Sequence, residues 1–415
     1  MNGPAASAGG FARPAPDARL VPRPVYPAAL ESWWLAEAGR ATGRADPEEA
    51  LDALAPDIEA LSDAFTVDRA PGFGGYARDD RRLAAYGVFF FPQTWARAAF
   101  AMREAAAFRG RPAAPPAAGP WRVLDLGAGT GAAGFAALDA LSGAGRGAEL
   151  VSADRSGESL QYAARLFADR REALWPRASH RTAAADLAGA PELGRSWDLV
   201  IVSFALNERF ESRPDADLHG WAAAWLRRLA PGGVLAIVEP GTRDAARRLQ
   251  RLRDRVAAAG EGEILGPCLH AGACPMRPRE DLWCHEVRRW QPPPGLAWVN
   301  RRLHRSTGEL RFSFLLLGPA SGATAAAAPG DGRRARLVAP IREQKGLLTT
   351  FGCAGDGLLH AYERRTRGLG RAGIKRAMEV ERGDVLEWEA PAPAAEAGRA
   401  RRVDSLERRA FGFAP

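Results

Sequence analysis

The chain has 415 residues, 47% of them hydrophobic, and its 57 basic residues exceed its 49 acidic ones. That length is more than one ordinary domain, so two or three domains are expected. Only Lys345 and Lys375 are lysines, and abundant Ala, Gly, Pro and Arg can reflect base composition, so the charge of +8 is weak evidence for nucleic-acid binding. No stretch approaches ~18 apolar residues, and the N-terminus lacks the apolar segment of a secretory signal. The sequence therefore predicts a cytoplasmic protein without a membrane span.

Composition and periodicity divide the chain into six predicted segments. Residues 1–25 read as a disordered Pro/Ala tail, and residues 26–115 as a helical domain because apolar residues recur at spacings of three and four. Residues 116–260 alternate strands and helices, which predicts a parallel sheet covered by helices on both faces. Residues 261–306 are rich in Cys, 307–391 read as a β-rich module, and 392–415 as a flexible tail.

A glycine turn at residues 121–134, WRVLDLGAGTGAAG, organises the α/β segment. An apolar strand carries Asp125 and ends in Gly127, Gly129 and Gly131, and a small-residue helix follows. Such a turn lets bare backbone approach a ligand and directs N–H groups at it. The alternative is a glycine turn that serves only strand–helix packing.

Polar side chains stand at the ends of the predicted strands, where ligands of parallel sheets bind. Asp125 can hold the cationic methionine end of S-adenosylmethionine, Asp154 can take the ribose hydroxyls, and Asp186 can meet the adenine amino group. Ser203 ends the fourth strand. Together with the LAPGG turn at 229–233, this set looks like a class I methyltransferase fold and favours S-adenosylmethionine over a dinucleotide.

A catalyst for methyl transfer is not evident. Methylation of a ring carbon through a covalent adduct needs a cysteine near the fourth strand, and this segment has none. In the loop after that strand, Phe204 can stack on a base and Asn207 can accept an amine proton. Equally, Phe204 can be a core residue and Asn207 a turn residue.

The four cysteines are Cys268, Cys274, Cys284 and Cys353, and none precedes residue 268. Four thiolates suit tetrahedral zinc or an iron–sulfur cluster. Gaps of five and nine residues fit zinc less well than a larger cluster. His270 and His285 lie beside these cysteines and can donate to sulfur or replace one thiolate. The alternative is four unrelated buried thiols.

Basic residues concentrate around and after the cysteines, with aromatic residues among them. Arginine forks and aromatic planes suit phosphates and unstacked bases, although a solvated basic surface explains the same pattern. The residues are Arg288, Arg289, Arg301, Arg302, Arg305, Arg364, Arg365, Arg367, Arg371, Lys375 and Arg376, with Trp290, Trp298 and Tyr362.

The order of motifs resembles the methyltransferase-like proteins of the small ribosomal subunit, the mitochondrial assembly factors and their bacterial relatives. The motifs are the glycine turn, VEPGT (238–242), GPCLHAGACP (266–275), WCH (283–285), RFSFLLL (311–317) and REQKG (342–346). The resemblance covers roughly residues 85–390. It implies a class I methyltransferase fold, a 4Fe-4S cluster on Cys268, Cys274, Cys284 and Cys353, and binding to small-subunit ribosomal RNA and its assembly intermediates.

The sequence therefore leaves three alternative functions. The first is a ribosome assembly factor, a monomer that binds S-adenosylmethionine at residues 116–260, a cluster at 261–306 and RNA at 307–391. The second is an active RNA methyltransferase that uses Asn207 or nearby polar groups. The third is a zinc-stabilised regulatory protein that senses S-adenosylmethionine.

Overall fold

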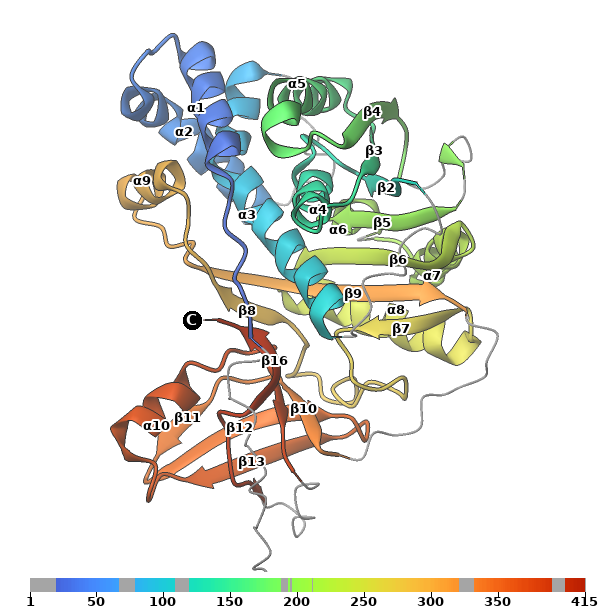
Figure 1. The fold of residues 1–415 in the computed structure, drawn as a ribbon, viewed down its shortest axis with the longest axis vertical. Coiled ribbons are helices and arrows are strands. Elements are labelled where there is room, and N and C mark those ends of the chain that lie inside the picture. The colour runs from blue at the N-terminus through green and yellow to red at the C-terminus, as the bar shows by residue number, and fades with distance from the viewer. Residues whose placement is uncertain are drawn as a thin grey trace, which may run out of the picture.

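The computed structural model describes residues 20–66, 79–108, 119–187, 193–194, 196–210, 212–320, 332–389 and 400–414. Among the described residues, no helix is both long enough and apolar enough to cross a membrane. Two sheets and a group of helices are arranged along the long axis of the molecule (Figure 1). The predicted disordered tail at 1–25 lies mostly outside the described residues, but its end forms β1 (Leu20–Val21).

Three helices precede the first sheet, as periodicity predicts: α1 (Ala28–Thr42), α2 (Pro47–Thr66) and α3 (Asp80–Phe108). The α2 helix begins where Asp46 precedes Pro47, and the Asp46 Oδ1 accepts a hydrogen bond from the Glu49 backbone N–H at 2.9 Å. The long α3 helix crosses in front of the first sheet (Figure 1). The helical segment is thus a cover for that sheet.

The first sheet has the strand order β4-β3-β2-β5-β6-β9-β7, with β8 paired to β9. The strands β2 (Trp121–Leu126), β3 (Ala148–Asp154), β4 (Ala178–Ala184), β5 (Trp197–Ser203) and β6 (Leu229–Pro240) are parallel. The strand β9 (Glu309–Pro319) runs antiparallel to β6, to β7 (Gly262–Gly266) and to β8 (Glu286–Arg289). This order confirms the predicted class I methyltransferase, Rossmann-like fold.

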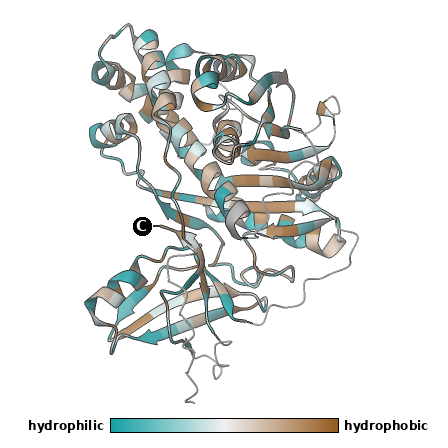
Figure 2. Ribbon diagram, viewed as in Figure 1, coloured by the Kyte–Doolittle hydropathy of each residue, from teal (hydrophilic) through white to brown (hydrophobic). Residues whose placement is uncertain are grey.

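Helices connect the strands of this sheet. They are α4 (Ala132–Gly143), α5 (Gly157–Leu174), α6 (Leu206–Phe210), α7 (Asp215–Leu226), α8 (Arg243–Ala259) and α9 (Pro294–Arg302). In Figure 2 the central strands are mostly apolar, while the outer faces of several helices are polar. The sheet is therefore buried between helical layers, as expected for parallel strands.

The second sheet has the order β1-β16-β14-β10-β12-β13-β15, with β11 paired to β12. Its strands are β10 (Arg334–Leu337), β11 (Arg342–Gln344), β12 (Leu347–Ala354), β13 (Leu359–Arg365), β14 (Val385–Glu387), β15 (Arg401–Arg402) and β16 (Arg409–Phe413). The helix α10 (Gly370–Met378) packs beside it (Figure 1). A β-rich C-terminal module is therefore present, although residues 370–378, expected to be β, are helical.

Two predicted boundaries are wrong, because both depend on long-range strand pairing. The β module does not begin at residue 307, since β9 pairs with β6 and β7 in the first sheet. The segment 392–415 is not simply a flexible tail, since β15 and β16 pair with β13 and β14. Of that region, only residues 392–399 and 415 lie outside the described chain.

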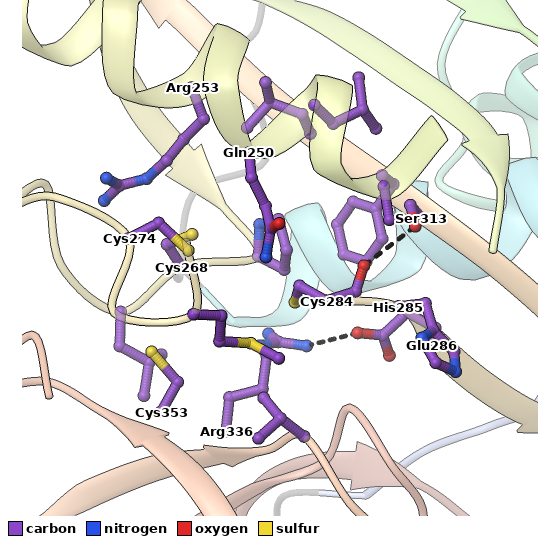
Figure 3. Close-up of a pocket in the computed structure, with 18 of the residues that line it drawn as sticks. Gln250, Arg253, Cys268, Cys274, Cys284, His285, Glu286, Ser313, Arg336 and Cys353 are labelled. Atoms are coloured by element: carbon purple, nitrogen blue, oxygen red, sulfur yellow. Dashed lines mark hydrogen bonds and ion pairs between the residues drawn. The ribbon is translucent and has the colours of Figure 1, made fainter. Parts of the chain in front are cut away.

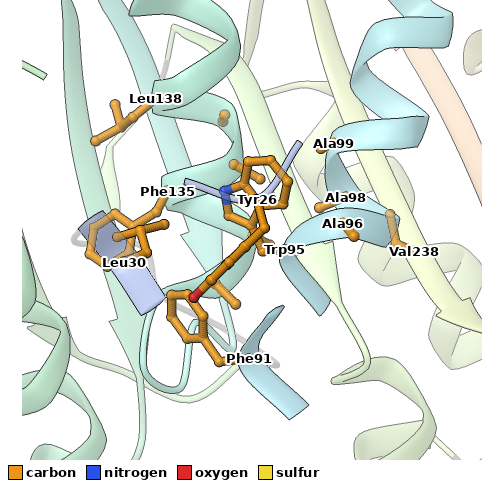
Figure 4. Close-up of a cluster of buried hydrophobic side chains, with 14 of the residues drawn as sticks. Tyr26, Leu30, Phe91, Trp95, Ala96, Ala98, Ala99, Phe135, Leu138 and Val238 are labelled. Atoms are coloured by element: carbon orange, nitrogen blue, oxygen red, sulfur yellow. The ribbon is translucent and has the colours of Figure 1, made fainter. Parts of the chain in front are cut away.

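Aromatic packing fixes α3 against the first sheet (Figure 4). Tyr26 meets Trp95 edge to face at 5.4 Å between ring centroids, and Phe91 lies 6.5 Å from Phe135 of α4. The Trp95 indole N–H also donates to Asp139 at 2.6 Å. Because a packed aromatic core resists displacement, residues on α3 have a fixed position relative to the strand ends.

A buried ionic network joins the two sheets and α3. Arg288 of β8 lies 2.6 Å from Glu286 and also pairs with Asp384, while Arg336 of β10 pairs with Glu104 of α3 and lies 3.3 Å from Glu286. Burial raises the pKa of Glu104 to about 7. Because each charge here would be costly alone, the network requires the second sheet to dock in one arrangement.

Candidate ligand cradle and cysteine cavity

The glycine turn lies between β2 and α4, as predicted. Gly127 has φ of 67°, and a Cβ there would lie 2.5 Å from the Ala205 Cβ, so a larger residue would displace the loop after β5. A Cβ at Gly134 would lie 2.9 Å from the Asp125 carboxylate. These positions need glycine for backbone conformation and for close approach.

Asp125 is 1% exposed at the end of β2. Its Oδ2 accepts a hydrogen bond from the Gly134 backbone N–H at 2.8 Å, while its Oδ1 is buried without a partner among the described residues. Burial raises the pKa of the Asp125 carboxyl to about 7. An unpartnered carboxylate oxygen at this point is suited to a cationic group of a ligand.

The other predicted cradle residues gather at the same edge of the sheet, but they differ in what they contact. Asp154 accepts hydrogen bonds from the backbone N–H groups of Gly129 and Ser156, each at 2.8 Å, so it also shapes the turn. Asp186 is 60% exposed and lies 3.3 Å from Arg209. The Ser203 hydroxyl is buried without a partner.

The two catalytic candidates follow β5. Phe204 lies in the loop directly after the strand, whereas Asn207, expected in the same loop, lies on α6. Phe204 has φ of 59°, which is uncommon for a bulky residue, and its backbone N–H donates to the Val238 carbonyl at 2.8 Å. The Leu206 and Asn207 backbone N–H groups donate to the Glu239 carboxylate, the first at 3.0 Å. The Asn207 side chain is half-buried. Within the described part of the chain, no acidic or basic side chain forms a hydrogen bond with the Asn207 side chain.

Glu239 was not among the predicted site residues. It is 2% exposed at the end of β6, and its Oε2 has no partner. Burial raises the pKa of Glu239 to about 8. The sequence does carry a signal for Glu239, because VEPGT places an acid at the end of an apolar strand. The Glu239 carboxylate accepts hydrogen bonds from the first turn of α6, close to Phe204.

The four cysteines, separated by up to 85 positions in the sequence, line one cavity of about 50 Å³. Figure 3 shows their side chains around a common space, with Cys353 entering from the second sheet and the other three from loops beside α8. Within the described parts of the chain, no group of three or more His, Cys, Asp or Glu is arranged to hold a single metal ion.

Arginines hold the carbonyls of the cysteine loops in place. Arg253 of α8 donates to the Gly272 and His270 carbonyls, the second at 2.6 Å. Arg382 donates to the His285 and Trp283 carbonyls at 2.9 and 2.8 Å. The loops are therefore held by one buried and one half-buried arginine, and both also lie near the thiols.

Burial favours the neutral form of three of the four thiols. Burial raises the pKa of Cys274 to about 11 and raises the pKa values of Cys284 and Cys353 further. The His270 Nε2 lies 3.5 Å from the Cys353 Sγ, which agrees with a histidine beside sulfur as a hydrogen-bond partner. Buried thiols with raised pKa values need a nearby cationic group to become thiolates together.

Part of the predicted RNA-facing set is buried instead. Arg288 and Tyr362 are at most 1% exposed and Trp290 is 6% exposed, so these three belong to the ionic network and the core. A basic patch remains exposed at the end of β13 and on α10. Its members are Arg365, Arg367, Arg371 and Lys375.

A family model described as mitochondrial small ribosomal subunit Rsm22 matches residues 81–387. The chain belongs to the Rsm22 family. The match spans α3, the ligand cradle, the cysteine cavity and the second sheet as far as β14. No curated protein matches this Rsm22-family chain.

Several solved structures are similar over part of the chain. An S-adenosylmethionine-dependent methyltransferase from Clostridium acetobutylicum is 21% identical over 29% of this chain and 42% of its own, with a TM-score of 0.24. A methyltransferase of the same cofactor class from Leishmania major is 15% identical over 68% and 90%, with a TM-score of 0.33. The citrinin polyketide synthase CMeT domain is 16% identical over 67% of each chain, with a TM-score of 0.38. The Rsm22-family chain thus spans less than half of the first of these structures.

Proposed function

We propose that this protein binds S-adenosylmethionine, holds a 4Fe-4S cluster, and acts in small ribosomal subunit assembly or translation through binding of ribosomal RNA. The observation that carries the proposal is the convergence of all four cysteines on one cavity in a chain of the Rsm22 family. The glycine turn and the Asp125 oxygen that has no partner among the described residues support the proposed binding of S-adenosylmethionine.

The cavity favours a cluster over zinc. A single water needs roughly 10–15 Å³ of such space, whereas this cavity offers about 50 Å³. A structural zinc ion holds its sulfur ligands at about 2.3 Å and leaves no comparable space between them. Four thiols around a larger, mostly apolar space suit several metal and sulfide atoms.

The residues around the cavity could bind a 4Fe-4S cluster and balance its negative charge. Cys268, Cys274, Cys284 and Cys353 would be its ligands, and when bound the cluster would link the two sheets covalently through metal–sulfur bonds. Arg253 and Arg382 offset the negative charge of thiolates, since both interact electrostatically with cysteines of the cavity. His270 supplies a hydrogen-bond donor to the Cys353 sulfur.

The exposed patch on β13 and α10 is the proposed RNA contact. Arg365, Arg367, Arg371 and Lys375 are exposed, and no ion pair within the described chain is recorded for them. Cations without protein partners are available to phosphates. The proposed place of action is the compartment that holds the small subunit, which the sequence predicts to be the cytoplasm, and the proposed state is a monomer.

An active RNA methyltransferase is the second candidate, because Phe204 is held in an uncommon backbone conformation beside the cradle. Transfer of a tritiated methyl group to small-subunit precursor RNA, lost on Asp125→Ala, would establish it. A zinc-stabilised sensor of S-adenosylmethionine is the third, and metal analysis separates it from the other two.

The cluster is tested by iron, sulfide and zinc content after anaerobic purification. We expect about four iron and four sulfide per chain and broad absorbance near 400 nm. Cys284→Ser should lose both, whereas Met276→Leu, which changes the same cavity without touching a thiol, should retain them. Colourless protein with stoichiometric zinc would reject the cluster and favour the sensor.

The ribosome part is tested by co-sedimentation with 30S particles at rising salt. Association should weaken with salt, and replacing Arg371 and Lys375 by Gln should reduce it further. The matched control is Arg44→Gln, an exposed arginine that lies 3.9 Å from Glu49. No association at low salt would contradict the proposal.

A further inference from the structure

One stripe of α3 differs from the rest of that helix. From Leu83 to Ala101 every residue is buried except Tyr86, Phe90, Thr94 and Arg97, which are half-buried. Their spacing of four, four and three places them on one face of the helix. Most of this part of α3 is therefore buried, and these four residues form one half-buried stripe.

This stripe lies beside the ligand cradle. The Arg97 guanidinium lies over the Phe204 ring, 5.2 Å from its centroid. Tyr86 interacts electrostatically with Asp154, Glu208 and Arg97. Since Asp154 ends β3 and Phe204 follows β5, the stripe lies across the edge of the sheet where the cradle is.

Among the residues that the structure describes, Arg97 has no anionic partner. Its guanidinium makes one long hydrogen bond, 3.4 Å to Gln93 Oε1, and its Nε is buried with no partner. No ion pair to Arg97 is recorded anywhere in the described chain. Burial lowers the pKa of Arg97 to about 10, and the nearby Tyr86 opposes this.

The other arginines at this edge are already paired. Arg155 lies 3.7 Å from Glu208, and Arg209 lies 3.3 Å from Asp186. S-adenosylmethionine carries one anionic group, the carboxylate at its methionine end. Asp125, at the methionine end of the cradle, is suited to the ammonium of the same amino acid, so a cation is needed beside it for the carboxylate.

We propose that Arg97 binds the carboxylate of S-adenosylmethionine, with Phe204 supporting the guanidinium from the opposite face. The inference rests on the proposed binding of S-adenosylmethionine in the cradle. Arg97 contacts Phe204, and the next residue, Ala205, lies against Gly127 of the glycine turn. Because Arg97 is thus close to the cradle, a carboxylate of the ligand is favoured over an RNA phosphate as its partner. Arg97 is thus a ligand-binding residue supplied by the helical segment.

The test compares two ligands that differ by one group, S-adenosylmethionine and its decarboxylated form, by titration calorimetry on the full chain. The wild type should bind the first ~10- to 100-fold more tightly, as expected for a charge-assisted hydrogen bond. Arg97→Gln should lose that preference and bind the decarboxylated ligand unchanged, and Arg97→Lys should keep part of it. Arg82→Gln, exposed on the same helix, should behave as wild type.

The outcomes separate this inference from the proposed function. If Arg97→Gln weakens both ligands equally, or neither, the carboxylate contact is refuted while S-adenosylmethionine binding stands. If it weakens only RNA binding, the anion is a phosphate and the inference is also refuted. If the wild type binds neither ligand at millimolar concentration, the proposed ligand is wrong and the inference fails with it. Unchanged circular dichroism of each variant excludes misfolding as the cause.

Discussion

Affinity for S-adenosylhomocysteine should rise with pH between 5.5 and 7.5, because the Asp125 carboxyl must ionise before it can hold the ligand's ammonium. Burial raises the pKa of this carboxyl to about 7 in the free protein. It is then roughly 3% ionised at pH 5.5 and roughly 76% at pH 7.5, so affinity should increase about 25-fold across this range. The ligand's own ammonium is that of a free amino acid, which titrates above this range, so it stays protonated there.

The measurement is calorimetric titration at four pH values in buffers of different ionisation enthalpy. Binding near pH 6 should release about one proton, since the bound ammonium favours the ionised carboxylate. Asp125→Asn should bind weakly and without this pH dependence. Asp139→Asn, which changes a buried acid of α4 that contacts Trp95, should keep it. A flat wild-type profile, or proton uptake on binding, would refute the assignment of Asp125.

Further predictions concern stability. Glu104→Ala should lower the free energy of unfolding by about 3–5 kcal/mol, because Arg336 would be left buried without its main partner, and urea denaturation measures this. Asp52→Ala, which removes an exposed pair with Arg302, should cost less than about 1 kcal/mol. The Glu239 carboxyl ionises above ~4.5 when unfolded but only near 8 when folded, so its ionisation favours unfolding and stability should fall as pH rises through this window. Glu239→Gln should reduce that fall; an unchanged pH dependence would contradict the assignment.

The cradle could be predicted from the sequence, because the residues that form it follow short, recognisable local patterns. An apolar strand that ends in Asp125 and glycines dictates a tight turn, and acids after parallel strands must meet at one edge of the sheet. The helical segment before residue 108 was also predictable from apolar spacing. The convergence of the cysteines followed from their confinement to residues 268–353, with Pro267 and Pro275 stiffening the loop.

Long-range pairing was not predictable in the same way. The strand β9 reads like any apolar strand, and nothing within residues 309–319 indicates that it pairs with β6 instead of β10. The basic segment ending in Phe413 reads as a tail, yet it pairs with β14. Arg97 looks like an exposed arginine of a helix, and its isolation from anions depends on the placement of α3 against Phe204.

The cysteine cavity exists only when both sheets are in place. Cys268, Cys274 and Cys284 come from loops of the first domain, whereas Cys353 lies on β12 of the second sheet, where it pairs in register with Arg336 of β10. Arg336 is also the residue that Glu104 holds from α3. A cluster at this site would therefore form only after the helical segment, the methyltransferase-like sheet and the C-terminal sheet have assembled. A chain that ends at residue 320 would retain the ligand cradle but would lack both the fourth thiol and the cation that closes the cavity.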